Sequence, residues 1–165
     1  MSSLKLFRRM LSALVFILPL LSFATQAAPR VGDAVSFEVT LIGGQTLRSQ
    51  ELAGRPVLLV FWASWCPPCH AEMATLEKAY VNYRKQGLEI VAVSLDNSAE
   101  DAREFLRSHP VSFPAAMSTD HHTRQFGPLL WPPRLFVINR AGQLSASHWG
   151  TLSPAALTAT IRSIL

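Results

Sequence analysis

Residues 57–70 read VLLVFWASWCPPCH, and this stretch sets the architecture that the rest of the chain must follow. Its first part, residues 57–62, is a continuous apolar run, which is typical of a strand buried on both faces. Pro67 and Pro68 then stand where the first turn of a helix tolerates missing N–H groups. The stretch predicts a buried strand, a short loop that ends at Cys66, and a helix that carries Cys69.

The segments that follow alternate between helix and strand patterns. Apolar residues recur at helical spacing until Gly87 supplies a stop, namely Met73, Leu76, Tyr80 and Tyr83. Residues 88–95 (LEIVAVSL) are typical of a second buried strand, and Ser98 with Asp101 forms a capping-box-like start for another helix. A βαβ crossover therefore brackets the two cysteines.

Antiparallel strands complete the pattern at both ends. An alternating segment from Val35 meets Gly43-Gly44 and resumes at Thr46, which predicts a hairpin. Residues 113–117 form a short apolar segment, and residues 119–126 are typical of one or two helical turns. Residues 135–138 and 144–148 then predict two strands, and residues 153–164 predict a last helix. We expect one α/β domain over residues 31–165, a central mixed β-sheet flanked by helices with an N-terminal β-hairpin extension. The cysteines would lie at the carboxyl end of a central strand, where such folds place their sites.

The first 24 residues have the layout of a secretory signal peptide. Lys5, Arg8 and Arg9 precede an apolar run over residues 10–23, and cleavage after Ala24 or Ala27 fits the small residues there. The run is shorter than the roughly 20 residues of a spanning helix, although an uncleaved anchor in the inner membrane is the alternative. Export predicts a periplasmic protein, in a compartment where disulfides persist.

The basic charge of the chain does not indicate nucleic-acid binding. The sequence pI is about 9.6. Three of the 15 Lys and Arg residues lie in the predicted signal, which leaves 12 against 11 acidic residues. The remainder has no clustered basic stripe, so we expect no nucleic-acid partner.

The two cysteines form a Cys-x-x-Cys pair suited to redox chemistry without a cofactor or metal. A helix N-terminus lowers the pKa of a thiol, so Cys66 is the expected nucleophile. Cys69 lies one turn along the same face and is the expected resolving thiol of a redox-active disulfide. Because Pro67 and Pro68 offer no N–H to the Cys66 sulfur, we expect a reducing couple.

The segments VLLVFWASWCPPC with HAEM, GLEIVAVSLD and PPRLFVINRAGQL resemble the thioredoxin-like family of exported bacterial thiol-disulfide oxidoreductases, the TlpA/ResA type. The resemblance runs from about residue 31 to the C-terminus. It implies a thioredoxin-like fold and a periplasmic protein-disulfide reductase. The implied clients are exported proteins with disulfides, including apo-cytochromes c, and the implied electron donor is a membrane thiol-reductant transporter.

The resemblance also assigns residues around the dithiol. Its cis-proline falls on Pro133, preceded by Pro132, which has no N–H for a bound peptide and so predicts weaker or differently registered binding. The expected substrate-binding residues are Trp65, Pro67, Pro68, Pro132 and Pro133. Trp62 either walls the site with Trp65 or belongs to the core.

The proton acceptor of the resolving thiol is harder to place. Thioredoxin itself has a buried acid where this chain has Val60, and the ResA type has a glutamate where this chain has Asn97 beside Asp96. Asp96 is therefore the candidate acceptor, directly or through water. The alternative is a solvated loop aspartate that caps the next helix.

Two other chemistries fit parts of the motif. Cys-x-x-Cys-His is also a c-type haem attachment site, with His70 as axial ligand and Met73 or Met117 opposite. A copper carrier would combine the dithiol with His121, His122 or His148. The buried strand before the motif and the prolines inside it favour redox exchange, and His70 is then expected to be an exposed bystander.

Overall fold

The computed structural model describes residues 28–165, and the predicted signal peptide lies outside them. Seven strands form one sheet in the order β2-β1-β5-β4-β3-β6-β7. The strands are β1 (Glu38–Leu41), β2 (Thr46–Arg48), β3 (Val57–Trp62), β4 (Glu89–Ser94), β5 (Ala115–Met117), β6 (Arg134–Ile138) and β7 (Leu144–Trp149). The helices are α1 (Pro67–Tyr83), α2 (Ala99–Ser108), α3 (Asp120–Phe126) and α4 (Pro154–Arg162), with short 3₁₀ turns η1 (Ser49–Leu52) and η2 (Arg84–Gln86).

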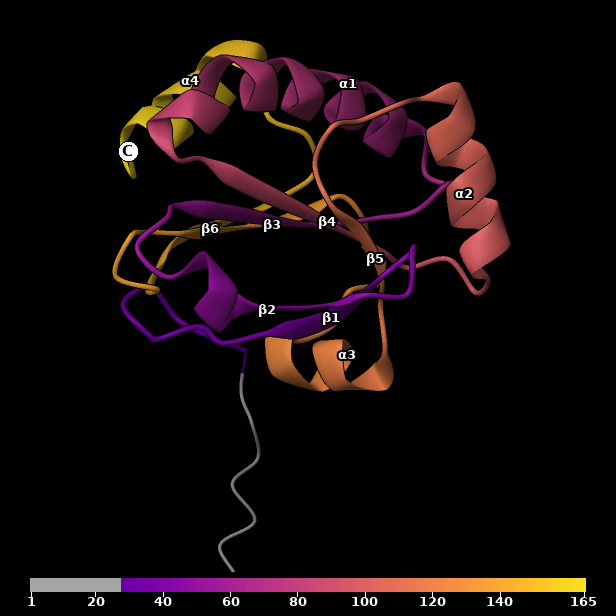
Figure 1. Ribbon diagram of the computed structural model, residues 1–165, viewed down its shortest axis with the longest axis horizontal. Coiled ribbons are helices and arrows are strands. Elements are labelled where there is room, and N and C mark those ends of the chain that lie inside the picture. Colours follow the sequence, from indigo (N-terminus) through magenta and orange to yellow (C-terminus); the bar gives the residue numbers. More distant parts are fainter. Residues whose placement is uncertain (1–27) are drawn as a thin grey trace, which may run out of the picture.

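The predicted mixed sheet flanked by helices is confirmed. Strand β3 runs parallel to β4 and antiparallel to β6, so it occupies a central position. Helices α1 and α4 cover one face of the sheet, and α3 lies on the opposite face (Figure 1). Strand β5 pairs with both β4 and β1, and this short strand joins the predicted N-terminal hairpin to the central sheet.

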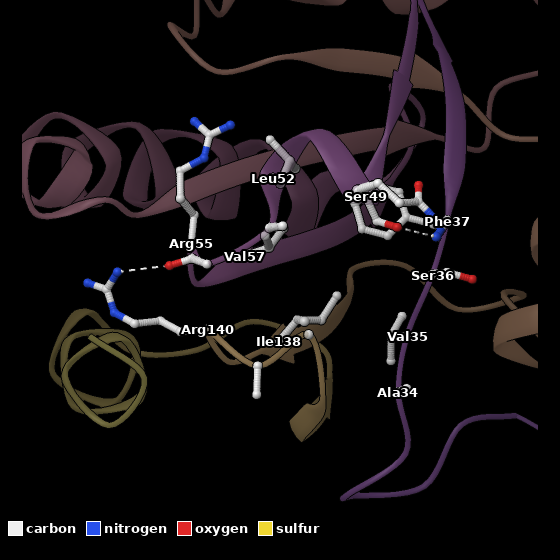
Figure 2. A pocket seen from close by; sticks show the side chains of 15 residues that line it. Ala34, Val35, Ser36, Phe37, Ser49, Leu52, Arg55, Val57, Ile138 and Arg140 are labelled. Carbon is white, nitrogen blue, oxygen red and sulfur yellow. Dashed lines mark hydrogen bonds between the residues drawn. The ribbon is translucent and has the colours of Figure 1, made fainter.

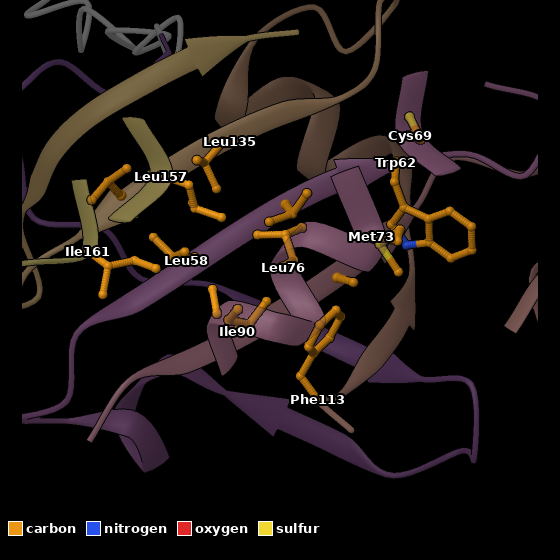
Figure 3. Close-up of a cluster of buried hydrophobic side chains, with 14 of the residues drawn as sticks. Leu58, Trp62, Cys69, Met73, Leu76, Ile90, Phe113, Leu135, Leu157 and Ile161 are labelled. Carbon is orange, nitrogen blue, oxygen red and sulfur yellow. The ribbon is translucent and has the colours of Figure 1, made fainter. Parts of the chain in front are cut away.

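All six residues of β3 are buried, and they supply both halves of the core. Successive side chains of a strand point to opposite faces, so Leu58 and Trp62 face α1 and α4 while Leu59 and Phe61 face α3. Figure 3 shows the first group, in which Leu58 and Trp62 pack with side chains of α1 and α4. Trp62 is fully buried with its ring 4.8 Å from that of Phe105, so it belongs to the core and does not wall the site.

A buried histidine holds α3 against the sheet. His122 is only 2% exposed. Its Nδ1 accepts a hydrogen bond from the Thr119 N–H at 2.9 Å, and its Nε2 lies 2.9 Å from the Glu38 carbonyl oxygen in β1. A carbonyl can only accept, so the ring is neutral with its proton on Nε2. Burial lowers the pKa of His122 below its ordinary 6.5, and the Glu38 carbonyl opposes this shift only in part.

This burial predicts acid sensitivity. The unfolded chain binds a proton at His122 near pH 6.5 while the folded chain does not. The contribution of His122 to stability is therefore complete above that pH, and it decreases as the pH falls toward the lower folded pKa, by at most about 1.4 kcal/mol per pH unit. Urea unfolding across this range should show a smaller pH dependence in His122→Gln than in the wild type. The exposed neighbour provides the control, since His121→Gln should retain the wild-type dependence; equal slopes in all three proteins would contradict the assignment.

Candidate active site

The two cysteines lie at the junction between the end of β3 and the start of α1. Cys66 is the N-cap residue of α1, and its Sγ accepts a hydrogen bond from the Cys69 N–H at 3.3 Å. A disulfide joins Cys66 to Cys69, and the two residues are 4% and 0% exposed. Cys66 is thus the more accessible of the two residues, and its sulfur is the one aligned with the helix N-terminus, where a thiolate is stabilised.

A proline loop faces Cys66 from the opposite side of the site. The Pro132 carbonyl oxygen lies 3.4 Å from the Cys66 Sγ, and the peptide bond between Pro132 and Pro133 is cis. In the disulfide form Sγ carries no hydrogen, whereas the reduced Cys66 thiol can donate to this carbonyl. The Gly150 N–H donates to the Pro133 carbonyl at 2.9 Å, which ties the loop to the end of β7.

Large apolar side chains stand exposed on both sides of this contact. Trp65 is 61% exposed, immediately before Cys66, while Leu130 and Trp131 are 72% and 77% exposed, immediately before Pro132. Pro67 and Pro68 are exposed as well, and Pro133 is buried. Sequence reasoning missed Leu130 and Trp131, although an apolar pair inside the loop GPLLWPP, away from any periodic element, could have indicated them.

Asp96 lies at the end of β4 but is neither solvated nor a helix cap. It is 8% exposed, and its carboxylate accepts hydrogen bonds from Ser64 and Ser94. The cap of α2 is Ser98, whose hydroxyl accepts from the Asp101 N–H at 3.1 Å. The alternative of a solvated aspartate that caps the next helix is therefore wrong, and the proton-acceptor role of Asp96 stays a prediction.

Glu72 is a buried carboxyl group that the sequence analysis did not identify. It lies one turn beyond Cys69 on α1 and is 3% exposed, with Oε2 accepting from the Leu152 N–H at 3.2 Å. Burial raises the pKa of Glu72 above its ordinary 4.5, and the hydrogen bond from Leu152 opposes the shift. The signal was present in the spacing, because Glu72 interrupts the buried helical stripe formed by Cys69, Met73 and Leu76.

His70 is not an exposed bystander. Its side chain is half-buried, with Nε2 2.8 Å from the Ser64 carbonyl oxygen. The ring packs 4.8 Å from Phe105 and 5.3 Å from His109. The expectation failed because the helix position alone does not show that α2 and the loop before Cys66 close over this ring.

Two of the histidines named for metal or haem binding are engaged in hydrogen bonds within the protein. His122 uses both ring nitrogens in hydrogen bonds within the protein, and His70 directs Nε2 at a backbone carbonyl. The two sulfurs that haem attachment would require are bonded to each other. Within residues 28–165, no three His, Cys, Asp or Glu side chains gather where they could hold a metal ion.

A pocket of about 300 Å³ lies at the other end of the sheet (Figure 2). Val57 and Ile138, which pair at the start of β3, line it together with Leu52 of η1. Arg140 stands at its edge and donates to the Gly54 carbonyl at 3.1 Å. Because the cysteines follow the opposite end of β3, this pocket is separate from the dithiol.

Comparisons with known proteins support the interpretation of Cys66 and Cys69 as a redox dithiol. The family model described as Redoxin matches residues 26–161. The chain is 31% identical to the thiol-disulfide oxidoreductase ResA of Halalkalibacterium halodurans over 79% of this chain and 75% of that protein. Two solved structures from Chlorobium tepidum are similar. One, described as a thiol:disulfide interchange protein DsbE, has a TM-score of 0.76 and 28% identity over 83% of this chain and 99% of that chain. The other, described as a thiol:disulfide interchange protein of the thioredoxin family, has a TM-score of 0.75 and 24% identity over 84% of this chain and 99% of that chain.

The buried carboxyl group predicts a stability change upon neutralisation. The pKa of Glu72 is higher in the folded protein than in the unfolded chain, so below pH 4.5 the carboxyl group is protonated in both and does not lower the free energy of unfolding. As the pH rises through the folded pKa, the buried group ionises and the free energy of unfolding decreases. Glu72→Gln retains an acceptor for the Leu152 N–H and removes the charge. Chemical denaturation should therefore show the variant to be more stable than the wild type at about pH 8 and nearly equal at about pH 4. The exposed Asp101→Asn serves as the control, because it removes a carboxylate that carries no burial cost, and a Glu72→Gln protein less stable than the wild type at the higher pH would refute the prediction.

Proposed function

Since this chain belongs to the Redoxin family and is a thiol-disulfide oxidoreductase whose redox pair is Cys66–Cys69, we propose that it reduces disulfides of other proteins in the periplasm. The observation that carries this proposal is the alignment of the Cys66 Sγ with the N-terminus of α1, 3.3 Å from the Cys69 N–H. The predicted signal peptide supports the location. The TlpA/ResA resemblance supports apo-cytochromes c among the clients and a membrane thiol-reductant transporter as the electron donor.

The exchange proceeds in two balanced steps. The Cys66 thiolate attacks one sulfur of the client disulfide, forms a mixed disulfide, and expels the other client sulfur as a thiolate that takes up a proton. The Cys69 thiolate then attacks the Cys66 Sγ and releases the second client thiol. Two electrons pass to the client, the Cys66–Cys69 disulfide remains, and a dithiol donor must reduce it before the next cycle.

The N–H groups that can donate to the Cys66 sulfur support a reducing rather than an oxidising couple. Pro67 and Pro68 occupy the first two positions of α1 and have no N–H, which leaves the Cys69 N–H as the helix donor that contacts Sγ. Stabilisation of the reduced form is what makes a dithiol oxidising, so limited stabilisation of the Cys66 thiolate favours a reducing couple.

Glu72 is the proton acceptor that the geometry supports for Cys69. The two residues lie three apart on the same face of α1, and burial raises the Glu72 pKa toward the range in which a carboxylate accepts protons effectively. Asp96 is the competing candidate. Its oxygens are already occupied by donors from Ser64 and Ser94, which favours Glu72.

The exposed apolar rim supports binding of an extended polypeptide. Trp65 on one side and Leu130 with Trp131 on the other flank the contact between Cys66 and Pro132. Exposed aromatic side chains at such positions commonly anchor a protein partner. Pro132 can accept a hydrogen bond from a client backbone but cannot donate one, so side-chain contacts carry more of the recognition.

The function is tested by titrating the dithiol of the mature protein against glutathione. We expect a two-electron couple nearer the about −270 mV of thioredoxin than the about −120 mV of DsbA, and Cys66→Ser should abolish it. Cys69→Ser should accumulate a mixed disulfide with a client, since the resolving thiol is missing. A Soret band in the purified protein would instead support the haem interpretation, and a strongly oxidising couple would overturn the proposed direction.

The apolar rim is tested by Trp131→Ala. Loss of an exposed anchor should raise KM for a peptide disulfide about tenfold and leave turnover of a small-molecule disulfide unchanged. Val81, which is 50% exposed on α1, provides the matched control, and Val81→Ala should affect neither substrate. Equal KM values for the peptide in Trp131→Ala and the wild type would show that the rim does not bind clients.

A further inference from the structure

Ser64 lies two residues before Cys66 and is bonded through its N–H, its hydroxyl and its carbonyl. It occupies the short loop between β3 and α1, in which the Cys66 N–H donates to the Ala63 carbonyl at 3.2 Å. The conformation of this turn sets the position of Cys66 relative to the helix. The partners of Ser64 are therefore in a position to influence the nucleophile without touching it.

Asp96 holds Ser64 from the side of β4. Both carboxylate oxygens lie 3.1 Å from the Ser64 nitrogen, and Oδ1 accepts from the Ser64 hydroxyl at 2.8 Å. The carboxylate is itself fixed, because Oδ2 accepts from the Ser94 hydroxyl at 2.7 Å and the Asp96 N–H donates to the same hydroxyl at 3.0 Å. Asp96 thus anchors the loop to the end of the buried strand β4.

His70 holds Ser64 from the side of α1. Its Nε2 lies 2.8 Å from the Ser64 carbonyl oxygen, and because that oxygen only accepts, Nε2 carries a hydrogen. The ring is kept in place by Phe105 and His109, which stack on each other with centroids 4.3 Å apart. His109, the C-cap residue of α2, is the titratable group that faces His70 from this element.

We propose that His70 and Asp96 are positioning residues that clamp the two sides of Ser64 and thereby align the reduced Cys66 sulfur with the N-terminus of α1. The proposal rests on the dithiol function above. In the oxidised protein the Cys66–Cys69 bond itself holds Sγ in place. The clamp therefore acts chiefly on the reduced form, in which the loop, the Cys69 N–H and the Pro132 carbonyl oxygen position the sulfur.

The clamp is tested with His70→Phe, which retains a ring against Phe105 and removes the hydrogen-bond donor. We expect a higher Cys66 pKa, measured from the ultraviolet absorbance of the thiolate, and alkylation by iodoacetamide at neutral pH slower by up to about tenfold. The reduced fraction at a fixed glutathione ratio should also decrease, because the reduced form loses stabilisation. His70→Gln retains a donor and should restore part of each value, and the exposed His121→Phe should match the wild type.

Asp96→Asn separates the clamp from direct proton transfer. The amide cannot accept from both serines as the carboxylate does, so the Cys66 pKa should increase as in His70→Phe. A normal Cys66 titration in Asp96→Asn, combined with slower release of the client by Cys69, would overturn the positioning role of Asp96 and make it the proton acceptor.

The outcomes also separate this proposal from the proposed function. If the wild type shows a Cys66-dependent two-electron couple but His70→Phe only lowers the unfolding temperature, with unchanged Cys66 pKa and alkylation rate in the folded protein, His70 is merely structural and the clamp is refuted. If the wild type lacks the couple, the proposed function fails first.

Discussion

The structure depends on one constraint, which is that both faces of β3 must be buried from solvent. Leu58 and Trp62 bury against the α1 side and Leu59 and Phe61 against the α3 side, so helices must cover the sheet above and below. Such an apolar strand must end where the helices no longer cover it, because further apolar residues would be exposed to solvent. The chain must leave it through a short loop, and the first positions after the loop are where Cys66 and α1 begin.

This constraint gives the dithiol its chemistry. Because α1 starts shortly after β3, its N-terminus lies at the Cys66 sulfur, which accepts from the Cys69 N–H, while the body of the helix packs on the core through Met73 and Leu76. Cys69 falls within the first turn and is fully buried. Cys66 therefore keeps a small exposed fraction at the edge of the core, whereas Cys69 is fully enclosed, an asymmetry that suits attack by one thiol and resolution by the other.

The same region contains groups that are unfavourable for stability. Glu72 is a carboxyl group inside an apolar stripe, and Leu130 and Trp131 expose large apolar surfaces to water. A chain selected for stability alone would replace all three. Their position around the cysteines supports the view that they serve the exchange reaction, while the polar contacts of Asp96 and His70 keep the loop ordered.

Local patterns along the chain were sufficient for the order of strands and helices, the buried strand, and the Cys-x-x-Cys pair at a helix start, because each rests on spacing within a few neighbouring residues. They failed where a side chain meets a partner distant in the sequence. His70 was expected to be exposed, but α2 brings Phe105 and His109 over it. The helix-cap alternative for Asp96 failed because β4 places its carboxylate beside Ser64. The sequence analysis did not identify Glu72, whose place in the apolar stripe of α1 indicates burial but whose partner, the Leu152 N–H, comes from a distant segment. Spacing within a segment is encoded locally, whereas the burial and partners of a polar group depend on which distant segments pack against it, and only the tertiary structure decides that.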